Sequence, residues 1–346
     1  MKRRIHNHIR VVTIVVLLLI SASTFALAAE ADVQVIDQTG RLVSIPQPVT
    51  RIVSAYGIST YYVYALGAGD RIVNAWYVQI KGLSKAPDAL WKMEPKLDEK
   101  LSFGTPNLED IVSRNPDLVL TNPTKHGDLA DRLINLGIPA VQYIAETPNA
   151  MKEAMLLTGK VLGPETASRA QDFAAYYDRM MAKIADATKG ILDADRLRVY
   201  FCGSSPLRAA SGDMYQSLMV DTAGGVSVTA GMHGYWNNVN IEQILVWNPD
   251  VIIITSYGGL TVQQILDDPD WQSISAVKSG RVYKMPALAA AWDAPVPDSL
   301  LGIMWLAHAL YPNEVNIDLA GECCSFYSKF YNYTLSDEEV ARLMGE

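Results

Sequence analysis

The chain has 346 residues, of which 49% are hydrophobic and 19% charged, and its formal net charge is −8 at pH 7. This acidic balance argues against a nucleic-acid partner, because binding to phosphates requires a basic surface. Three cysteines do not make a disulfide framework, and we expect them to be buried thiols.

Residues 1–28 have the pattern of a secretory signal peptide. Four basic residues among the first ten precede an apolar run at residues 11–20, and Ala26-Leu27-Ala28 offers small residues at a cleavage position. The run is about half of the ~20 residues that span a bilayer, so a permanent anchor is the weaker alternative. No cysteine for lipid attachment precedes Cys202. We therefore expect a soluble protein outside the cytoplasm, with 318 residues and a net charge of −12 once the four basic residues are removed.

The first elements after residue 30 alternate between strands and helices. Residues 33–46 alternate apolar and polar positions around Asp37-Gln38-Thr39-Gly40, which predicts a β-hairpin. Short aliphatic strands are then expected at 51–55 and 71–76, with a helix at about 59–67 between them. Such alternation is typical of a parallel sheet with helices on both faces.

The segment that follows occurs twice in the chain. "NLEDIVSRNPDLVL" at 107–120 and "NIEQILVWNPDVII" at 240–253 share six identical residues of fourteen. In each copy an asparagine is placed to cap a helix, Asn-Pro ends the helix, and a buried strand follows. The repeat predicts two lobes of similar construction, and the length of the chain predicts two hydrophobic cores.

The remaining pattern supplies the second lobe and the connection to it. "GDLADRLINLGIPAVQYI" predicts a helix and a strand in the first lobe, and strands are expected at 196–203 and 281–286 of the second, with a short helix at 213–224. Residues 165–189 hold no glycine or proline and predict one stiff helix of about 37 Å that joins the lobes. Phe326, Tyr327, Phe330 and Tyr331 lie at helical spacing near the C-terminus, which favours packing.

These elements give an α/β fold of two Rossmann-like lobes with parallel sheets, bridged by one long helix, with a ligand cleft between the lobes. The boundaries we expect are a signal peptide at 1–28, an N-terminal lobe at 29–150, a helical bridge at 151–192, a C-terminal lobe at 193–312 and a helical segment at 313–346.

Taken together, these segments resemble the periplasmic binding proteins of ABC importers for ferric siderophores, haem and cobalamin. "RIVSAYGISTYYVYALGAGDRIVNAW" is similar to the family's opening strand, helix and strand, the two repeats look like its paired glutamate segments, and "DWQSISAVKSGRVYKMP" looks like its closing segment. The chain departs from the family in a long loop at 78–106 and in lacking a lipid-attachment cysteine.

Glu109 and Glu242 stand in the first turn of the two repeated helices. An acidic residue is favoured there by the positive helix terminus, at about 0.3 to 1 kcal/mol, and this explains each glutamate separately. The resemblance implies a second role, in which both glutamates dock into arginine-containing pockets of the two permease subunits. The partners implied are thus an ABC permease dimer with its ATPase, served by a monomeric binding protein.

Candidate ligand-binding residues are those in loops that follow strand ends, because open α/β sheets bind ligands there. The set is rich in aromatic and cationic side chains, and comprises Tyr56, Trp76, Tyr77, Lys125, His126, Arg208, Met214, His233, Tyr235, Trp236, Tyr257 and Trp292. Such walls suit a large ligand with residual negative charge. A ferric siderophore fits this description, as do haem and a corrinoid.

No bare metal ion or cofactor is expected as a resident group. His126, His233 and His308 are dispersed and match no zinc spacing, although His126 and His233 remain open as axial ligands to a metal inside a chelate. No sequence motif of a hydrolase, metalloprotease or nucleotide-binding enzyme is present. We expect a binding protein that delivers an iron(III) chelate of the siderophore type to an ABC importer. A metal chelatase and a ligand sensor are the alternatives from other functional classes.

Overall fold

The computed structural model describes residues 31–77 and 88–345. The predicted signal peptide lies outside the described residues, as does the start of the long loop at 78–106. The described remainder of that loop contains two short helices, α3 (Asp88–Met93) and α4 (Leu97–Lys100).

The N-terminal lobe is built on a parallel sheet of four strands. The predicted hairpin precedes it as β1 (Val33–Ile36) and β2 (Leu42–Ile45), paired antiparallel. The sheet has the order β4-β3-β5-β6, and its strands are β3 (Ile52–Ser54), β4 (Ile72–Ala75), β5 (Leu118–Thr121) and β6 (Ala140–Gln142). Every residue of β3, β5 and β6 is buried, as expected of a parallel sheet that is covered on both faces.

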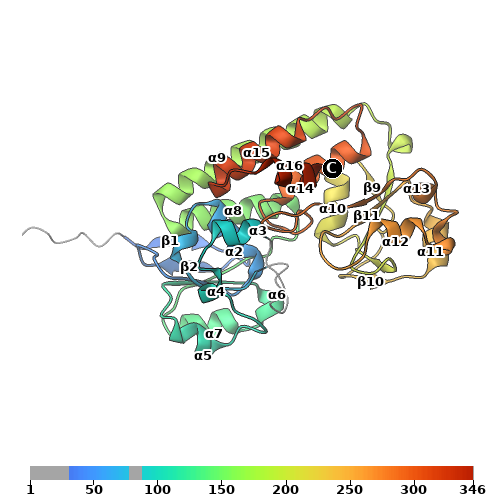
Figure 1. The fold of residues 1–346 in the computed structure, drawn as a ribbon. Helices are drawn as coiled ribbons and strands as arrows, with labels where there is room; N and C mark the ends of the chain where they lie inside the picture. Colours follow the sequence, from blue (N-terminus) through green and yellow to red (C-terminus); the bar gives the residue numbers. More distant parts are fainter. Residues whose placement is uncertain (1–30, 78–87, 346) are drawn as a thin grey trace, which may run out of the picture.

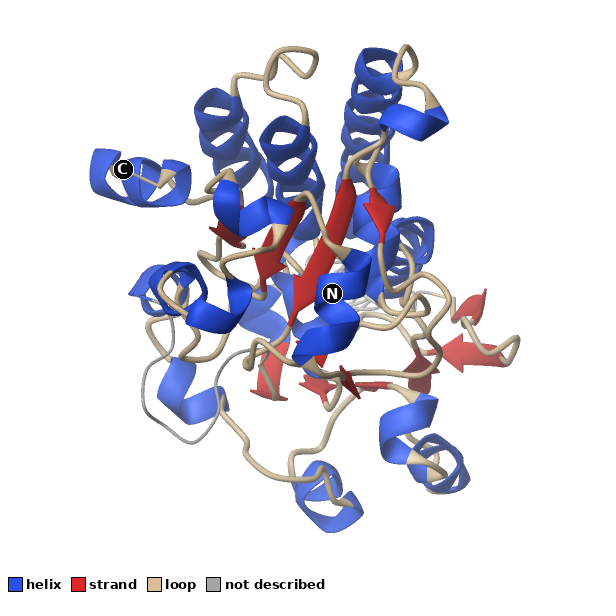
Figure 2. Ribbon diagram, turned by 90° about the vertical axis from the view of Figure 1, so that its right-hand side faces the viewer, coloured by secondary structure: helices blue, strands red, loops and turns tan. Residues whose placement is uncertain are grey.

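Helices connect the strands of this sheet in the sequence, and Figure 2 shows helices lying around the strands of the molecule. They are α2 (Gly57–Ala65), α5 (Leu108–Ser113), α6 (Pro123–His126) and α7 (Leu129–Asn135). Asn107 caps α5 by accepting a hydrogen bond from the Asp110 N–H at 2.8 Å. The predicted strand and helix alternation of this lobe is therefore present.

The C-terminal lobe repeats that sheet and adds an antiparallel edge. The parallel strands are β7 (Arg198–Cys202), β9 (Val226–Ser227), β11 (Val251–Ile254) and β12 (Val282–Lys284). The neighbours β9-β7-β11-β12 match the order of the first lobe. The short strands β8 (Arg208–Ala209) and β10 (Asn237–Asn238) pair antiparallel beside β7, so this sheet is mixed, whereas the sequence predicted a purely parallel one.

The helices of this lobe lie largely between its strands in the sequence, as in the first lobe. They are α10 (Tyr215–Thr222), α11 (Ile241–Trp247), α12 (Val262–Leu266), α13 (Ser275–Lys278) and α14 (Ser299–Leu310). Asn240 caps α11 through the Gln243 N–H at 2.8 Å, as Asn107 caps α5.

The lobes are joined by helices that run along one side of the molecule (Figure 1). The chain passes through α8 (Pro148–Leu162) and the 25-residue α9 (Pro164–Thr188), which is the predicted long helix. After the second lobe, the chain returns along α9 as α15 (Leu319–Tyr331). The last helix, α16 (Asp337–Met344), contacts the first lobe through an ion pair between Lys92 and Glu339. The predicted bridge of one helix is thus reinforced by a second one.

The aromatic stripe of the C-terminal segment packs into this bridge. Phe326 and Phe330 are buried, and their rings lie 6.5 and 5.3 Å from the ring of Phe173 in α9. One hydrophobic cluster therefore continues from the first lobe through α9 into the second, with smaller clusters on the outer side of each lobe. The expectation of two separate cores was wrong, because the bridge shares its apolar face with both lobes.

No helix in the described part of the chain is long and apolar enough to cross a membrane.

Candidate ligand site between the lobes

Tyr56 and His126 stand at the carboxyl edge of the first sheet, after β3 and β5. Their rings meet edge to face with centroids 6.5 Å apart. Tyr56 is only 2% exposed, and its hydroxyl makes no hydrogen bond of normal geometry within the described residues, although the Asn122 side chain lies near enough to lower its pKa slightly against the effect of burial. A buried hydroxyl without a partner is costly, so it marks a position where a ligand atom would be stabilised.

A backbone hydrogen bond selects one tautomer of the neutral His126 ring. Its Nδ1 accepts a hydrogen bond from the Asn122 N–H at 3.0 Å. Burial, helped by Lys125, lowers the pKa of His126 to about 4, so the ring is neutral at pH 7. With Nδ1 accepting, the proton of a neutral ring resides on Nε2. His126 thus offers an N–H donor toward a ligand, and coordination of a metal through Nε2 would require loss of the Asn122 bond.

Lys125 and Glu146 complete this edge of the first lobe. Lys125 is exposed and follows Asn122, the cap of α6, whose side chain accepts from the Lys125 N–H at 2.9 Å. Glu146, after β6, is partly buried, and burial raises the pKa of its carboxyl while Lys125 opposes the rise. Glu146 was absent from the sequence-based set, which held only aromatic, cationic and sulfur-containing side chains. The strand-end rule that selected Tyr56 would also have found it.

The second lobe contributes one cationic side chain, Arg208, which lies among aromatic rings. The Arg208 guanidinium lies 5.9 Å from the centre of the Trp236 ring, a cation–π distance. Tyr257 follows β11, and burial and Asp293 raise its pKa while Arg208 opposes the rise. The loop of Tyr257 is fixed by the buried Asp293, whose carboxylate accepts from the Ser256 hydroxyl at 2.5 Å.

Contacts between the lobes bring the two edges together. Burial raises the pKa of Tyr56 well above its usual range, and Glu146 and Tyr235 of the opposite lobe add to the rise. The Tyr62 hydroxyl of the first lobe donates to the Pro295 carbonyl of the second at 2.7 Å. We call this region the inter-lobe site, and it comprises Tyr56, Lys125, His126, Glu146, Arg208, Tyr235, Trp236 and Tyr257.

Four residues of the sequence-based set lie elsewhere. Trp292 is fully buried, and its Nε1 donates to the Tyr327 hydroxyl at 3.3 Å. Tyr77 is buried among tyrosines, with its hydroxyl 3.0 Å from that of Tyr64. Trp76 donates to the Gly104 carbonyl at 3.0 Å and packs on the outer cluster, and Met214 is buried in the core at the start of α10. Position after a strand does not set the direction of a side chain, and the contact of these four residues with a ligand stays a prediction.

His233 lies at the surface of the second lobe and is 84% exposed. Its Nδ1 lies 3.3 Å from the carboxylate of Asp213. Its contact with a ligand stays a prediction, as does its role as an axial ligand.

Glu109 and Glu242 occupy equivalent places in the two lobes. The chain enters α5 past the end of β4, where the Ser102 N–H donates to the Ala75 carbonyl at 2.9 Å. It enters α11 from β10, which pairs with β8 at the carboxyl end of β7. Both side chains are exposed, and neither forms an ion pair or hydrogen bond within the described residues.

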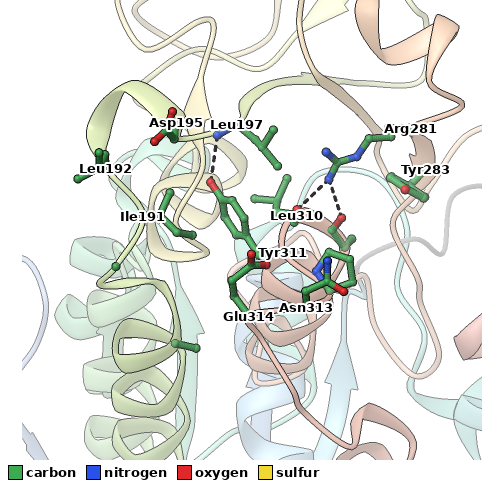
Figure 3. Close-up of a pocket in the computed structure, with 14 residues that line it drawn as sticks. Ile191, Leu192, Asp195, Leu197, Arg281, Tyr283, Leu310, Tyr311, Asn313 and Glu314 are labelled. Carbon is green, nitrogen blue, oxygen red and sulfur yellow. Dashed lines mark hydrogen bonds between the residues drawn. The ribbon is translucent and has the colours of Figure 1, made fainter.

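A hollow of about 800 Å³ lies at the opposite edge of the second sheet, before β7 and β12 (Figure 3). Two of the polar side chains that line it, Arg281 and Tyr311, are engaged by the protein itself. Arg281 donates to the carbonyls of Ala309 and Leu310 at 3.0 and 2.8 Å, and the Tyr311 hydroxyl donates to the Gly224 carbonyl at 2.9 Å. These hydrogen bonds hold the end of α14 beside the start of β12, at the sheet edge opposite the inter-lobe site.

The described residues contain no group of three or more histidine, cysteine or acidic side chains that could hold a metal ion. All three cysteines lie in the described part and none forms a disulfide; Cys202 and Cys323 are buried as expected, but Cys324 is exposed. The inter-lobe site is thus rich in hydrogen-bond donors and aromatic faces, and poor in metal-ligating atoms.

This arrangement defines a two-lobed ligand-binding protein with a helical bridge. The chain belongs to the family described as "Periplasmic binding protein", whose model matches residues 52–289. This membership confirms the resemblance seen in the sequence. The protein is a substrate-binding protein for an ABC importer and not an enzyme.

Several known proteins are similar over much of the chain. The molybdate-binding protein MolA of Haemophilus influenzae is 27% identical over 345 residues, which cover 92% of this chain and 97% of MolA. Its structure with molybdate has a TM-score of 0.76 at 25% identity and covers 88% of this chain and 99% of that one. A periplasmic solute binding protein from Veillonella parvula has a TM-score of 0.78 at 27% identity and covers 90% and 96% of the two chains. The vitamin B12-binding protein of Yersinia pestis is 28% identical over 222 residues, 62% of this chain and 72% of its own.

Proposed function

We propose that this protein captures an anionic iron(III) chelate of the siderophore type between its lobes and delivers it to an ABC importer. The observation that carries the proposal is the composition of the inter-lobe site, where Lys125, the Nε2–H of His126 and Arg208 supply donors to an anion. The aromatic faces of Tyr235, Trp236 and Tyr257 supply contact area for an organic framework. Tyr235 is 55% exposed and thus open to stacking.

A compact metal oxyanion is the second candidate ligand. The buried hydroxyl of Tyr56 could donate to an oxyanion oxygen. The similarity to MolA, which binds molybdate, supports the same candidate. Haem and corrinoids remain alternatives of the same importer class, and a vitamin B12-binding protein is among the relatives.

The proposal is tested by titrating the purified protein with a ferric siderophore, molybdate, haem and cobalamin, with binding followed by calorimetry. Arg208→Ala should weaken the ligand that binds by about 10- to 100-fold, because a hydrogen bond to a charged group contributes ~1.5–3 kcal/mol. Arg198→Ala is the matched control, because Arg198 is exposed at the opposite end of β7. Equal effects of both variants, or binding of none of these ligands, would overturn the proposal.

Delivery would use Glu109 and Glu242 as docking residues for the two permease subunits. Both carboxylates are exposed and without partners in the described part, at matching positions of the two lobes. Beside Glu242, a hollow of about 270 Å³ is lined by Val246 and Trp247, and Val246 is 82% exposed. This apolar rim next to an acid suits a partner segment that combines a basic side chain with an apolar one.

A further inference from the structure

The Arg208 side chain is exposed at the carboxyl edge of the second sheet. Within the described residues its guanidinium forms no ion pair and donates no hydrogen bond. It lies instead against an aromatic ring, with 5.9 Å between the guanidinium carbon and the centre of the Trp236 ring. Because a cation–π contact uses the face of the ring and not the N–H groups, the donors of Arg208 stay available to a ligand.

The backbone of Arg208 is fixed by the antiparallel edge of the sheet. Its carbonyl accepts from the Gly203 N–H at 2.7 Å, and its N–H donates to the Ser205 carbonyl at 3.1 Å, which closes the turn between β7 and β8. Arg208 also pairs with Asn238 of β10. Trp236 precedes Asn238 by two residues, and diagonal neighbours at this offset are within reach of long side chains. The register of β8 and β10 therefore brings the guanidinium and the indole together.

Gly203 leaves free the space that the indole occupies. It is buried directly after β7, and a Cβ at this position would lie 3.1 Å from both Cε3 and Cζ3 of Trp236. Carbon atoms pack favourably at about 3.5–4.0 Å, so a methyl group here would push the ring away. Because the ring is rigid, it would move as a whole, and its contact with Arg208 would change.

We propose that Gly203 is a positioning residue of the inter-lobe site, which seats the Trp236 ring so that the ring holds the Arg208 guanidinium ready for an anionic group of the ligand. This inference rests on the proposed function and adds the device that prepares its main cation. The fork of a guanidinium matches two oxygens of one carboxylate or oxyanion. A long side chain that is already held in place loses less freedom on binding, so the contact increases affinity.

The first test uses the ligand-free protein and reads the Nε–H signal of Arg208 by NMR, assigned by its loss in Arg208→Lys. We expect the ring current of Trp236 to shift this signal in the wild-type protein. Trp236→Leu should abolish the shift, and Gly203→Ala should reduce it. Gly231→Ala is the matched control and should keep the shift, because a Cβ there meets no atom within 4 Å. An equal shift in Gly203→Ala and wild type would overturn the inference and leave the proposed function in place.

The second test is a double-mutant cycle on affinity, measured by calorimetry with molybdate and ferric citrate as probes. Gly203→Ala should weaken the probe that binds by about tenfold in the wild-type background, the loss expected for one hydrogen bond to a charged group. In the Arg208→Ala background the same change should cost less than about twofold, because the effect passes through the guanidinium. Gly231→Ala should cost less than about twofold in both backgrounds.

Equal losses from Gly203→Ala in the two backgrounds would overturn the inference, because Gly203 would then act on the ligand without Arg208. The proposed function would stand in that case, since the probe still binds. Binding of neither probe by the wild-type protein would count against the inference and the proposed function together. Circular dichroism of each variant establishes that it is folded.

Discussion

Asp117 and Asp250 make the same backbone connection in the two lobes, 133 positions apart. The Asp117 N–H donates to the Arg51 carbonyl at 2.8 Å and its carboxylate accepts from the Arg51 N–H at 2.9 Å. Asp250 makes the same two contacts with Arg198, both at 2.8 Å. The preceding asparagines of both copies adopt a left-handed backbone, with φ of 48° and 39°. The repeated sequence is therefore a structural device that ties a helix end to the first parallel strand of each lobe.

Although the two aspartates are equivalent in position, their replacement by alanine should lower the free energy of unfolding by different amounts. The Asp117 carboxylate accepts two further hydrogen bonds from Thr50, through its N–H and its hydroxyl, both at 2.8 Å. Asp117→Ala should lower the free energy of unfolding by about 2–3 kcal/mol and Asp250→Ala by about 1 kcal/mol, because more donors lose their acceptor in the first case. Urea denaturation measures both values. A larger loss for Asp250→Ala would contradict the assignment of these contacts.

The bridge should be the most sensitive part of the core. Phe173 is fully buried between α9 and α15, and Phe173→Ala should cost about 3–5 kcal/mol through the cavity it leaves. Gln171→Ala, at an exposed position of the same helix, should change stability by less than about 0.5 kcal/mol. Thermal and urea unfolding of the two variants check this prediction. Similar stabilities would show that the lobes do not depend on the bridge.

His126 should make stability fall in mild acid. Its pKa is about 4 in the folded protein, against about 6.5 for an unfolded chain, so the unfolded state binds more protons between these values. The contribution of His126 is thus fully present above about pH 6.5 and is lost as the pH falls toward 4. His126→Asn keeps an acceptor near the Nδ1 position but removes the titrating group. The difference in unfolding free energy between wild type and variant, measured from pH 7 to pH 4, should shrink as the pH falls, and a constant difference would contradict it.

Docking and ligand binding should separate by mutation. Reversal of both proposed docking residues, Glu109→Arg with Glu242→Arg, should abolish uptake by the importer and leave the affinity for ligand unchanged, because both side chains lie outside the inter-lobe site. Glu338→Arg, exposed on α16, is a matched charge reversal that should preserve uptake. Uptake assays and calorimetry measure the two properties. Loss of ligand affinity in the double variant would place these residues in the binding site instead.

The elements were predictable from the sequence because local signals agree with the fold. Asn107 and Asn240 were expected to cap helices, and both do so through the N–H three residues later. The antiparallel strands β8 and β10 were missed, because each has two residues and no periodicity to detect. The shared core was missed as well, since contacts of Phe173 with Phe326 and Phe330 join segments about 150 positions apart.

From the sequence, only the loops that carry the candidate site could be predicted, and not the direction in which each side chain points. Tyr56 and Arg208 lie where the strand-end rule predicts, and so does Glu146, which that rule had not been used to find. Trp292 follows the same rule but points into the core, where Tyr327 takes its indole N–H. Side-chain direction depends on packing between distant segments, which spacing along the chain does not encode.

The central claim is that the lobes hold an anionic metal species between donors and aromatic rings. Native mass spectrometry of the protein isolated from its host tests this claim most directly, combined with absorbance and elemental analysis of the bound material. We predict one anionic metal-containing ligand per chain, lost or strongly reduced in Arg208→Ala. A metal-free neutral or cationic solute, retained equally by Arg208→Ala, would contradict the account.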